Sequence, residues 1–303
     1  MQINLPTPHG NKLRALLKNP KLPQSDYGNV VNALAIYENW LSNLANVQGS
    51  YSVIVEQQVN LLTQYKQYIE LDLIFDSPNN FLYRQKGQLK LDNTIIEEFI
   101  PILITAVFAN KLTGKNLTFG PTSCFSGIRF ETSITQQVDG GGFILRSKDH
   151  DFAISRQLYI RTSHQQDFSD SVTKETHIAL FAAECKTNLD KTMFQEASAT
   201  ALDVKLAVPG AKYYLLCEWL DMTPISTSIT AIDEILILRH AKRMSSNTRR
   251  LFSSYEGRKA NRNIFVKHLT SHPYSIKTFS RFINHISKLV EEDSDNVLSR
   301  GYF

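Results

Sequence analysis

One segment constrains the fold more than any other: residues 176–186 (THIALFAAECK) are apolar on both of the faces that a β-strand would present. Alternate positions form two apolar sets, Ile178, Leu180 and Ala182 on one face and Ala179, Phe181 and Ala183 on the other. A strand of this kind is typical of the middle of a sheet that is covered on both sides. The sequence therefore predicts a layered α/β fold with this strand at its centre.

The segments before this strand predict a helix followed by strands. Residues 95–111 have the apolar content of a buried helix, and residues 113–142 are rich in Gly, Ser and Thr with short apolar pieces. Residues 152–162 (FAISRQLYIRT) are strand-like, and the polar stretch 163–175 separates them from the central strand. A hairpin is the simplest connection between the two.

The segments after the central strand predict a crossover. Asn188 or Asp190 can cap a helix that ends before Pro209. Residues 212–220 (KYYLLCEWL) then form another strand. A strand, a helix and a strand of these lengths predict parallel pairing. The complete order, αβββαβ, predicts a mixed central sheet flanked by helices.

The chain divides into three regions on this interpretation. Residues 1–90 form a helical N-terminal region, residues 91–222 form the α/β core, and residues 223–303 form a basic, largely helical C-terminal region. In the last region, apolar residues at helical spacing predict one terminal amphipathic helix. They are Phe279, Phe282, Ile283, Ile286 and Leu289.

Composition excludes several classes of protein. A hydrophobic fraction of 42% in 303 residues is enough for a real core. No stretch approaches the ~20 apolar residues of a membrane span, and the N-terminus lacks the apolar segment of a signal peptide. Three cysteines without CxxC spacing argue against both a disulfide framework and a zinc site. We expect a cytoplasmic protein.

Charge is segregated along the chain. Residues 239–288 contain twelve Lys and Arg against one acid, whereas the remaining chain has 21 basic and 28 acidic residues. Such a pattern indicates a bound polyanion, although a solvated basic surface is the plainer alternative. The candidate DNA contacts are Arg249, Arg250, Arg258, Lys259, Arg262 and Lys267.

Two charged residues end the apolar central strand. Glu184 and Lys186 are two positions apart and would share a face. If residues 163 and 175 flank the hairpin loop, paired residue numbers sum to about 338, which places both opposite the region around Asp151. Asp149 would share a face with Asp151. The sequence thus predicts an Asp, a Glu and a Lys at one end of the sheet.

This grouping suits phosphodiester hydrolysis. Two carboxylates can hold a magnesium ion, which binds a phosphate oxygen and lowers the pKa of an attacking water. A lysine can orient or deprotonate that water, or offset charge on the phosphate. The bare acid-x-Lys pattern is weak evidence, because Asp203 and Lys205 also match it on the predicted helix. An ordinary ion pair at a strand end is the alternative.

Asp151 with Glu184-Cys185-Lys186 resembles the PD-(D/E)xK nuclease signature, and the order of elements is similar to that superfamily's αβββαβ core. Residues 184–220 are most similar to the Bpu10I family of type II restriction endonucleases. The resemblance implies magnesium-dependent cleavage of double-stranded DNA that leaves 5′-phosphates. It also implies a short asymmetric site of the CCTNAGC type and two different subunits.

Carried over by position, Asp151 and Glu184 would be metal ligands, and Lys186 would be the water-side base or stabiliser. The chain departs from the signature at the first acid: His150 stands where the motif has Pro, and Asp149 competes with Asp151. Superfamily members often have an acid on the first helix of the core. Glu97 or Glu98 fits, although an exposed helical acid is the simpler interpretation.

The leading hypothesis is a type II restriction endonuclease subunit that works as a homo- or heterodimer, because one site cuts one strand. A PD-(D/E)xK repair or recombination nuclease is an alternative within the same enzyme class. A DNA-binding subunit that supports a catalytic partner without cleaving is an alternative from another class.

Overall fold

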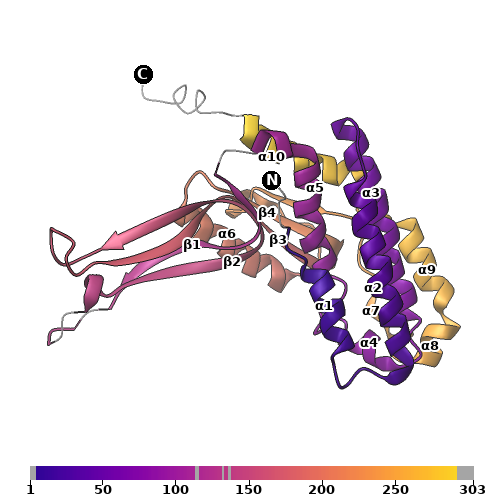
Figure 1. Cartoon of the computed structure of the whole chain (residues 1–303). Coiled ribbons are helices and arrows are strands. Elements are labelled where there is room, and N and C mark those ends of the chain that lie inside the picture. Colours follow the sequence, from indigo (N-terminus) through magenta and orange to yellow (C-terminus); the bar gives the residue numbers. More distant parts are fainter. Residues whose placement is uncertain (1–4, 113–115, 132, 136–137, 292–303) are drawn as a thin grey trace.

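A computed structural model describes residues 5–112, 116–131, 133–135 and 138–291, and Figure 1 shows a sheet with helices packed around it. The strands are β1 (Thr118–Phe130), β2 (Phe143–Thr162), β3 (Val172–Leu189), β4 (Lys212–Leu220) and β5 (Glu234–Ile237). The N-terminal helices are α1 (Pro8–Leu17), α2 (Gln24–Ala45), α3 (Tyr51–Tyr68), which continues as a π-helical segment (Ile69–Phe75), and α4 (Asn80–Gln85). The remaining helices are α5 (Thr94–Leu112), α6 (Lys191–Ala207), α7 (Ser246–Arg250), α8 (Tyr255–Ala260), α9 (Arg262–Ser271) and α10 (Ile276–Glu291).

The sheet is mixed, with the strand order β1-β2-β3-β4-β5. The β1–β2 and β2–β3 pairs are antiparallel, and the β3–β4 and β4–β5 pairs are parallel. Elements α5, β1, β2, β3, α6 and β4 follow in the predicted order, with β3 in the middle. The prediction of a mixed α/β architecture is confirmed. It missed β5, which lies inside the region predicted to be largely helical.

Strand β3 is covered on both sides, as its sequence predicts. Phe181, Ala183 and Cys185 belong to a core cluster shared with α5 and α10, whereas Ala179 and Ala182 pack in a second cluster with α6. The prediction that Ala179 shares a face of the strand with Phe181 and Ala183 was therefore wrong. The ladder shifts by one residue at Leu180, so Ala179 and Phe181 face opposite sides.

The hairpin between β2 and β3 differs from the predicted one in register. Phe152 pairs with Ala183 and, beyond the bulge, Ser155 pairs with Ala179, so paired numbers sum to 335 and then 334 instead of about 338. The reason is a loop of residues 163–171, shorter than predicted, together with the bulge. Asp151 still lies close to Glu184, because each directly adjoins one member of the Phe152–Ala183 pair.

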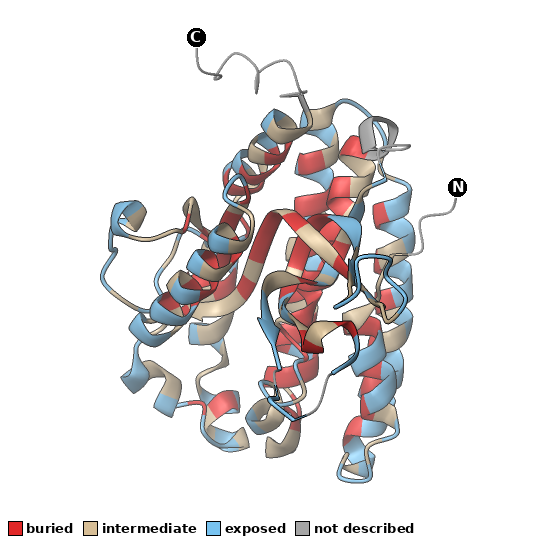
Figure 2. Ribbon diagram, turned by 90° about the vertical axis from the view of Figure 1, so that its left-hand side faces the viewer, coloured by how far each residue is buried: buried red, intermediate tan, exposed pale blue. Residues whose placement is uncertain are grey.

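Strand β2 bends back on itself. A straight strand of 20 residues would be roughly 65 Å long, yet its two ends approach each other. Lys174, which pairs with Ile160, donates to the carbonyl of Phe143, and Thr162 donates to the carbonyl of Gly140, each at 2.8 Å. The two hairpins therefore project together from the body, as Figure 1 shows at the left. Figure 2, turned towards this projection, shows buried residues concentrated where helices and strands face one another.

The N-terminal helices share the large core cluster with the sheet. Tyr37, Trp40 and Tyr65 from α2 and α3 pack in the same cluster as Phe99 of α5 and Phe181 of β3. The predicted terminal amphipathic helix is confirmed as α10: Phe279, Phe282, Ile283 and Ile286 are fully buried in that cluster. Within the described ranges, no helix is long and apolar enough to cross a membrane.

Candidate active site

The structure brings together Asp151, Glu184 and Lys186. Asp151 Oδ2 accepts a hydrogen bond of 2.8 Å from the backbone N–H of Cys185. Glu184 Oε1 lies 2.6 Å from Lys186 Nζ, and the two side chains are 21% and 28% exposed. The cluster is therefore half-buried and still open to solvent. Strand alternation places Glu184 and Lys186 together, and the hairpin adds Asp151.

Tyr213 completes the hydrogen bonding of Glu184, and no sequence pattern predicted this contact. Its hydroxyl donates to Glu184 Oε2 at 2.6 Å, while its ring is fully buried. Tyr213 pairs with Ala182 across the parallel β3–β4 ladder. Both carboxylate oxygens of Glu184 thus have a donor that fixes their direction.

The charges in this cluster do not balance. Burial raises the pKa of Asp151, and the nearby charge of Glu184 adds to that rise. Burial alone would raise the pKa of Glu184 too, but the hydrogen bonds from Lys186 and Tyr213 outweigh it and the pKa is lowered. Burial opposes the charge of Lys186, yet the hydrogen bond and charge of Glu184 raise its pKa. Among these three side chains, one cation faces two carboxylates.

Asp149, the alternative first acid, lies in a different setting. It is exposed and pairs with Ser123 across the β1–β2 ladder. His150 is buried, and its ring centroid is 6.3 Å from that of Tyr213. Asp151 is the acid that reaches β3.

Glu97 and Glu98 on α5 are both buried, so the expectation of an exposed helical acid was wrong. Glu98 anchors the N-terminus of α1: it accepts hydrogen bonds from the Tyr37 hydroxyl at 2.5 Å and from the His9 backbone N–H at 2.8 Å. For Glu97, burial and then the charge of Asp151 raise the pKa. Glu97 therefore lies close enough to Asp151 for their negative charges to interact.

The candidate DNA contacts of the C-terminal region lie in unlike settings. Arg258 is 1% exposed and donates to the carbonyls of Phe75 and Ser77 at 2.7 and 2.9 Å. Arg262 is half-exposed and forms a 2.7 Å ion pair with Asp76. Arg250, Lys259 and Lys267 are exposed, Arg249 is half-buried, and none of the four forms an ion pair within the described part of the chain.

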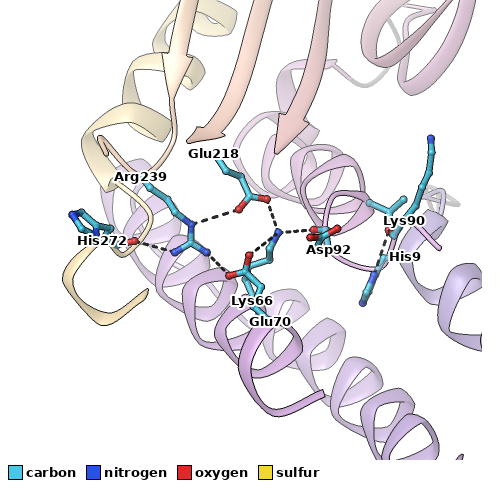
Figure 3. A network of polar contacts seen from close by, with 9 residues as sticks. His9, Lys66, Glu70, Lys90, Asp92, Glu218, Arg239 and His272 are labelled. Carbon is cyan, nitrogen blue, oxygen red and sulfur yellow. Dashed lines mark hydrogen bonds and ion pairs between the residues drawn. The ribbon is translucent and has the colours of Figure 1, made fainter. Parts of the chain in front are cut away.

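A second charge cluster lies on the other side of β4 and is buried, with Glu70 as its most exposed member at 9% (Figure 3). Lys66 Nζ is 2.5 Å from Glu218 Oε1 and 3.6 Å from Glu70 Oε1. Arg239 lies 3.0 Å from Glu70 and 3.5 Å from Glu218. Within these four side chains, two cations face two carboxylates.

The donor set of the half-buried cluster fits a hard divalent cation. Asp151 and Glu184 offer two carboxylates, and magnesium is usually held by one or two carboxylates with waters and substrate phosphates in its other positions. The residues described contain no group of three or more His, Cys, Asp or Glu side chains that could hold a metal by themselves.

Comparison with known proteins places the chain in a family. The family model of the Bpu10I restriction endonuclease matches residues 88–303, more than half of the chain. A solved chain described as "native BbvCI A2B2 tetramer at low resolution" is similar in fold, with a TM-score of 0.53 and 17% identity over 79% of this chain and 85% of that one. No match was found among curated protein sequences. The chain therefore belongs to the Bpu10I restriction endonuclease family and is a site-specific deoxyribonuclease.

Proposed function

We propose that the chain is a type II restriction endonuclease subunit that hydrolyses a phosphodiester bond of double-stranded DNA at the cluster of Asp151, Glu184 and Lys186. The observation that carries this proposal is the convergence of these three side chains at the end of a buried strand. An αβββαβ core with an acid on β2 and Glu-x-Lys on β3 supports assignment to the PD-(D/E)xK superfamily.

Asp151 and Glu184 would hold magnesium. When bound, the ion supplies Lewis-acid activation of the phosphate and a water of lowered pKa. Lys186 orients the attacking water and offsets negative charge on the phosphate. Tyr213 and the Cys185 backbone N–H hold the two carboxylates in place. Glu97, whose pKa is raised by burial and then by the charge of Asp151, would add negative charge near the metal when ionised.

DNA contact falls to the exposed cations of the C-terminal region. Arg250, Lys259 and Lys267 are free to reach phosphates, half-buried Arg249 lies beside them, and an arginine of this set can read guanine in the major groove. We leave Arg258 and Arg262 out of this set, because internal hydrogen bonds and an ion pair occupy them. Their role is to hold α8 and α9 against the N-terminal helices.

The proposal extends to the assembly. One such site cuts one strand, so cleavage of a duplex requires a second nuclease subunit, identical or different. The similar solved chain comes from a tetramer described as A2B2, which supports two kinds of subunit. The proposed target is a short, asymmetric CCTNAGC-like sequence, the products carry 5′-phosphates, and the enzyme acts in the cytoplasm.

A plasmid-nicking assay with magnesium tests the proposal, using wild type and Lys186→Ala with any partner subunit present. We expect wild type to cut and the variant to lose roughly two to three orders of magnitude in rate. Sequencing the ends would then give the site and stagger. Cleavage at structure rather than sequence would favour the repair nuclease. Binding without cleavage in wild type would favour the non-cleaving subunit and overturn the catalytic claim.

A further inference from the structure

A cavity of about 240 Å³ opens beside the proposed active site, at the carboxyl ends of β3 and β4. Asn188, two residues after Lys186, and Trp219 of β4 line it from the sheet. Asn93, which immediately precedes α5, and Arg249 of α7 line it from the helices. The crevice outside the carboxyl ends of parallel strands is where α/β proteins commonly bind ligands.

Two residues of this wall each carry a buried polar atom without a partner in the described part of the chain. Asn93 Oδ1 and Arg249 Nε are buried and make no hydrogen bond with any described residue. A buried polar atom without a partner destabilises a protein, and native structures rarely keep one without a reason. One of these atoms is an acceptor and the other is a donor. Asp92 and Lys86 add a carboxylate and an ammonium group to the same lining.

The floor of the cavity is rigid and charge-neutral. Glu70 lines it and is held by both Lys66 and Arg239, as Figure 3 shows. The Trp219 ring stacks on His268 with centroids 4.5 Å apart, and the Arg239 guanidinium lies 4.9 Å from the same ring. Trp219 is therefore covered on both faces, and the flat side chains left to contact a ligand are the partly exposed Tyr83 and Phe265, which also line the cavity.

The polar groups select the chemistry of that ligand. A phosphate offers only acceptors, so it would satisfy Arg249 and Lys86 but leave Asn93 Oδ1 and the Asp92 carboxylate without a donor. A nucleobase offers N–H donors, acceptors and flat apolar faces together. We propose that this cavity binds one base of the DNA substrate, swung out of the duplex while the neighbouring phosphodiester lies at Lys186. The inference rests on the proposed function, since it needs DNA at that site.

Binding to duplexes that lack a single base tests the inference. The full chain, with its partner subunit where cleavage requires one, is titrated without divalent metal against the duplex that it cuts. Each base is replaced in turn by an abasic residue. At one position the abasic residue replaces the pairing partner of the swung-out base. No base pair then has to be broken, so we expect wild type to bind that duplex about tenfold tighter or more than the intact duplex.

Two variants connect this effect to the cavity. Met244→Trp fills the cavity, and we expect the tighter binding of the duplex that lacks the partner base to disappear. Asn93→Leu removes the unpartnered acceptor at nearly constant volume, and the gain should shrink several-fold while the fold is kept, because no native hydrogen bond is lost. Asn43→Leu, the same change at an exposed position of α2, is the matched control and should keep the full gain.

The inference is overturned if no abasic position tightens binding in wild type, or if Met244→Trp keeps the same gain. A uniform weakening of all duplexes by Asn93→Leu and Met244→Trp would mean a plain backbone contact and would overturn it too. If the wild-type protein does not cleave DNA, that separate result contradicts the proposed function instead.

Discussion

Two charge clusters flank the ends of β3 and β4, and they differ in balance and exposure. In the buried cluster, Lys66, Glu218 and Arg239 are at most 2% exposed, and two cations meet two carboxylates. In the cluster of Asp151, Glu184 and Lys186, one cation meets two carboxylates, with side chains 21% and 28% exposed at Glu184 and Lys186. In the buried cluster the opposite charges cancel away from water, so its residues stabilise the fold. In the half-buried cluster an excess of negative charge faces water, so the same residue types are suited to catalysis.

The largest stability effect should come from breaking the balanced cluster. In Lys66→Met, the Glu218 and Glu70 carboxylates lose their ammonium partner in the interior. We expect the free energy of unfolding to fall by about 3–5 kcal/mol, measured by urea denaturation. The double variant Lys66→Met/Glu218→Leu should recover part of this loss. A loss below about 1 kcal/mol in the single variant would show that the cluster is not a tight structural unit.

Buried His9 should make the free energy of unfolding depend on pH. Burial, and then the charge of Lys66, lower its pKa to about 3. The unfolded chain binds a proton at His9 near pH 6.5, so the stability is fully present above that pH and declines as the pH falls towards 3. Between about pH 6.5 and about pH 5 we expect wild type to lose up to about 2 kcal/mol more than His9→Gln in urea denaturation. Equal losses in both proteins would contradict the assignment.

Tyr213 should affect function more than stability. Tyr213→Phe removes one donor to Glu184 Oε2 and leaves the packing intact. A hydrogen bond to a charged group contributes about 1.5–3 kcal/mol, so we expect the cleavage rate to fall roughly tenfold or more, with a higher magnesium requirement. A cleavage titration with magnesium measures both. An unchanged requirement would mean that Tyr213 does not position the carboxylate.

The smallest effects should separate the exposed arginines from the buried one. Arg250→Ala should leave the free energy of unfolding within about 0.5 kcal/mol and reduce the salt slope of DNA binding by about 1. Arg258→Ala should destabilise the fold by more than about 1 kcal/mol, because it removes donors to buried carbonyls. Denaturation and salt-dependent anisotropy measure the two effects. If Arg258→Ala changed only DNA binding, the distinction would fail.

Local patterns in the sequence were enough to predict part of this molecule. The central strand, the crossover helix capped by Asp190, and the shared face of Glu184 and Lys186 depend on residues close together in the chain. Strand β5 has only four residues, EILI, and so short an apolar run has no period to distinguish it.

The remaining features depend on contacts between distant segments. Tyr213 reaches Glu184 only through the β3–β4 register, and Lys66 meets Glu218 across 152 positions of sequence. Arg258 has the sequence setting of an exposed basic helix, yet it is buried because the carbonyls around Phe75 accept its donors. The shorter loop and the bulge at Leu180 together shifted the hairpin register without a sequence signal. Asp151 could be placed near Glu184 nonetheless, because the shift was small.

The most direct test of the account compares two aspartates on β2. Asp151→Asn alters the acid that contacts β3, and Asp149→Asn makes the same change at an exposed position two residues earlier. Cleavage rates in magnesium are measured beside metal-free DNA binding for both variants. We predict that Asp151→Asn loses roughly two to three orders of magnitude in rate but still binds DNA, while Asp149→Asn cuts like wild type. The reverse pattern, or full activity in Asp151→Asn, would contradict the proposed active site.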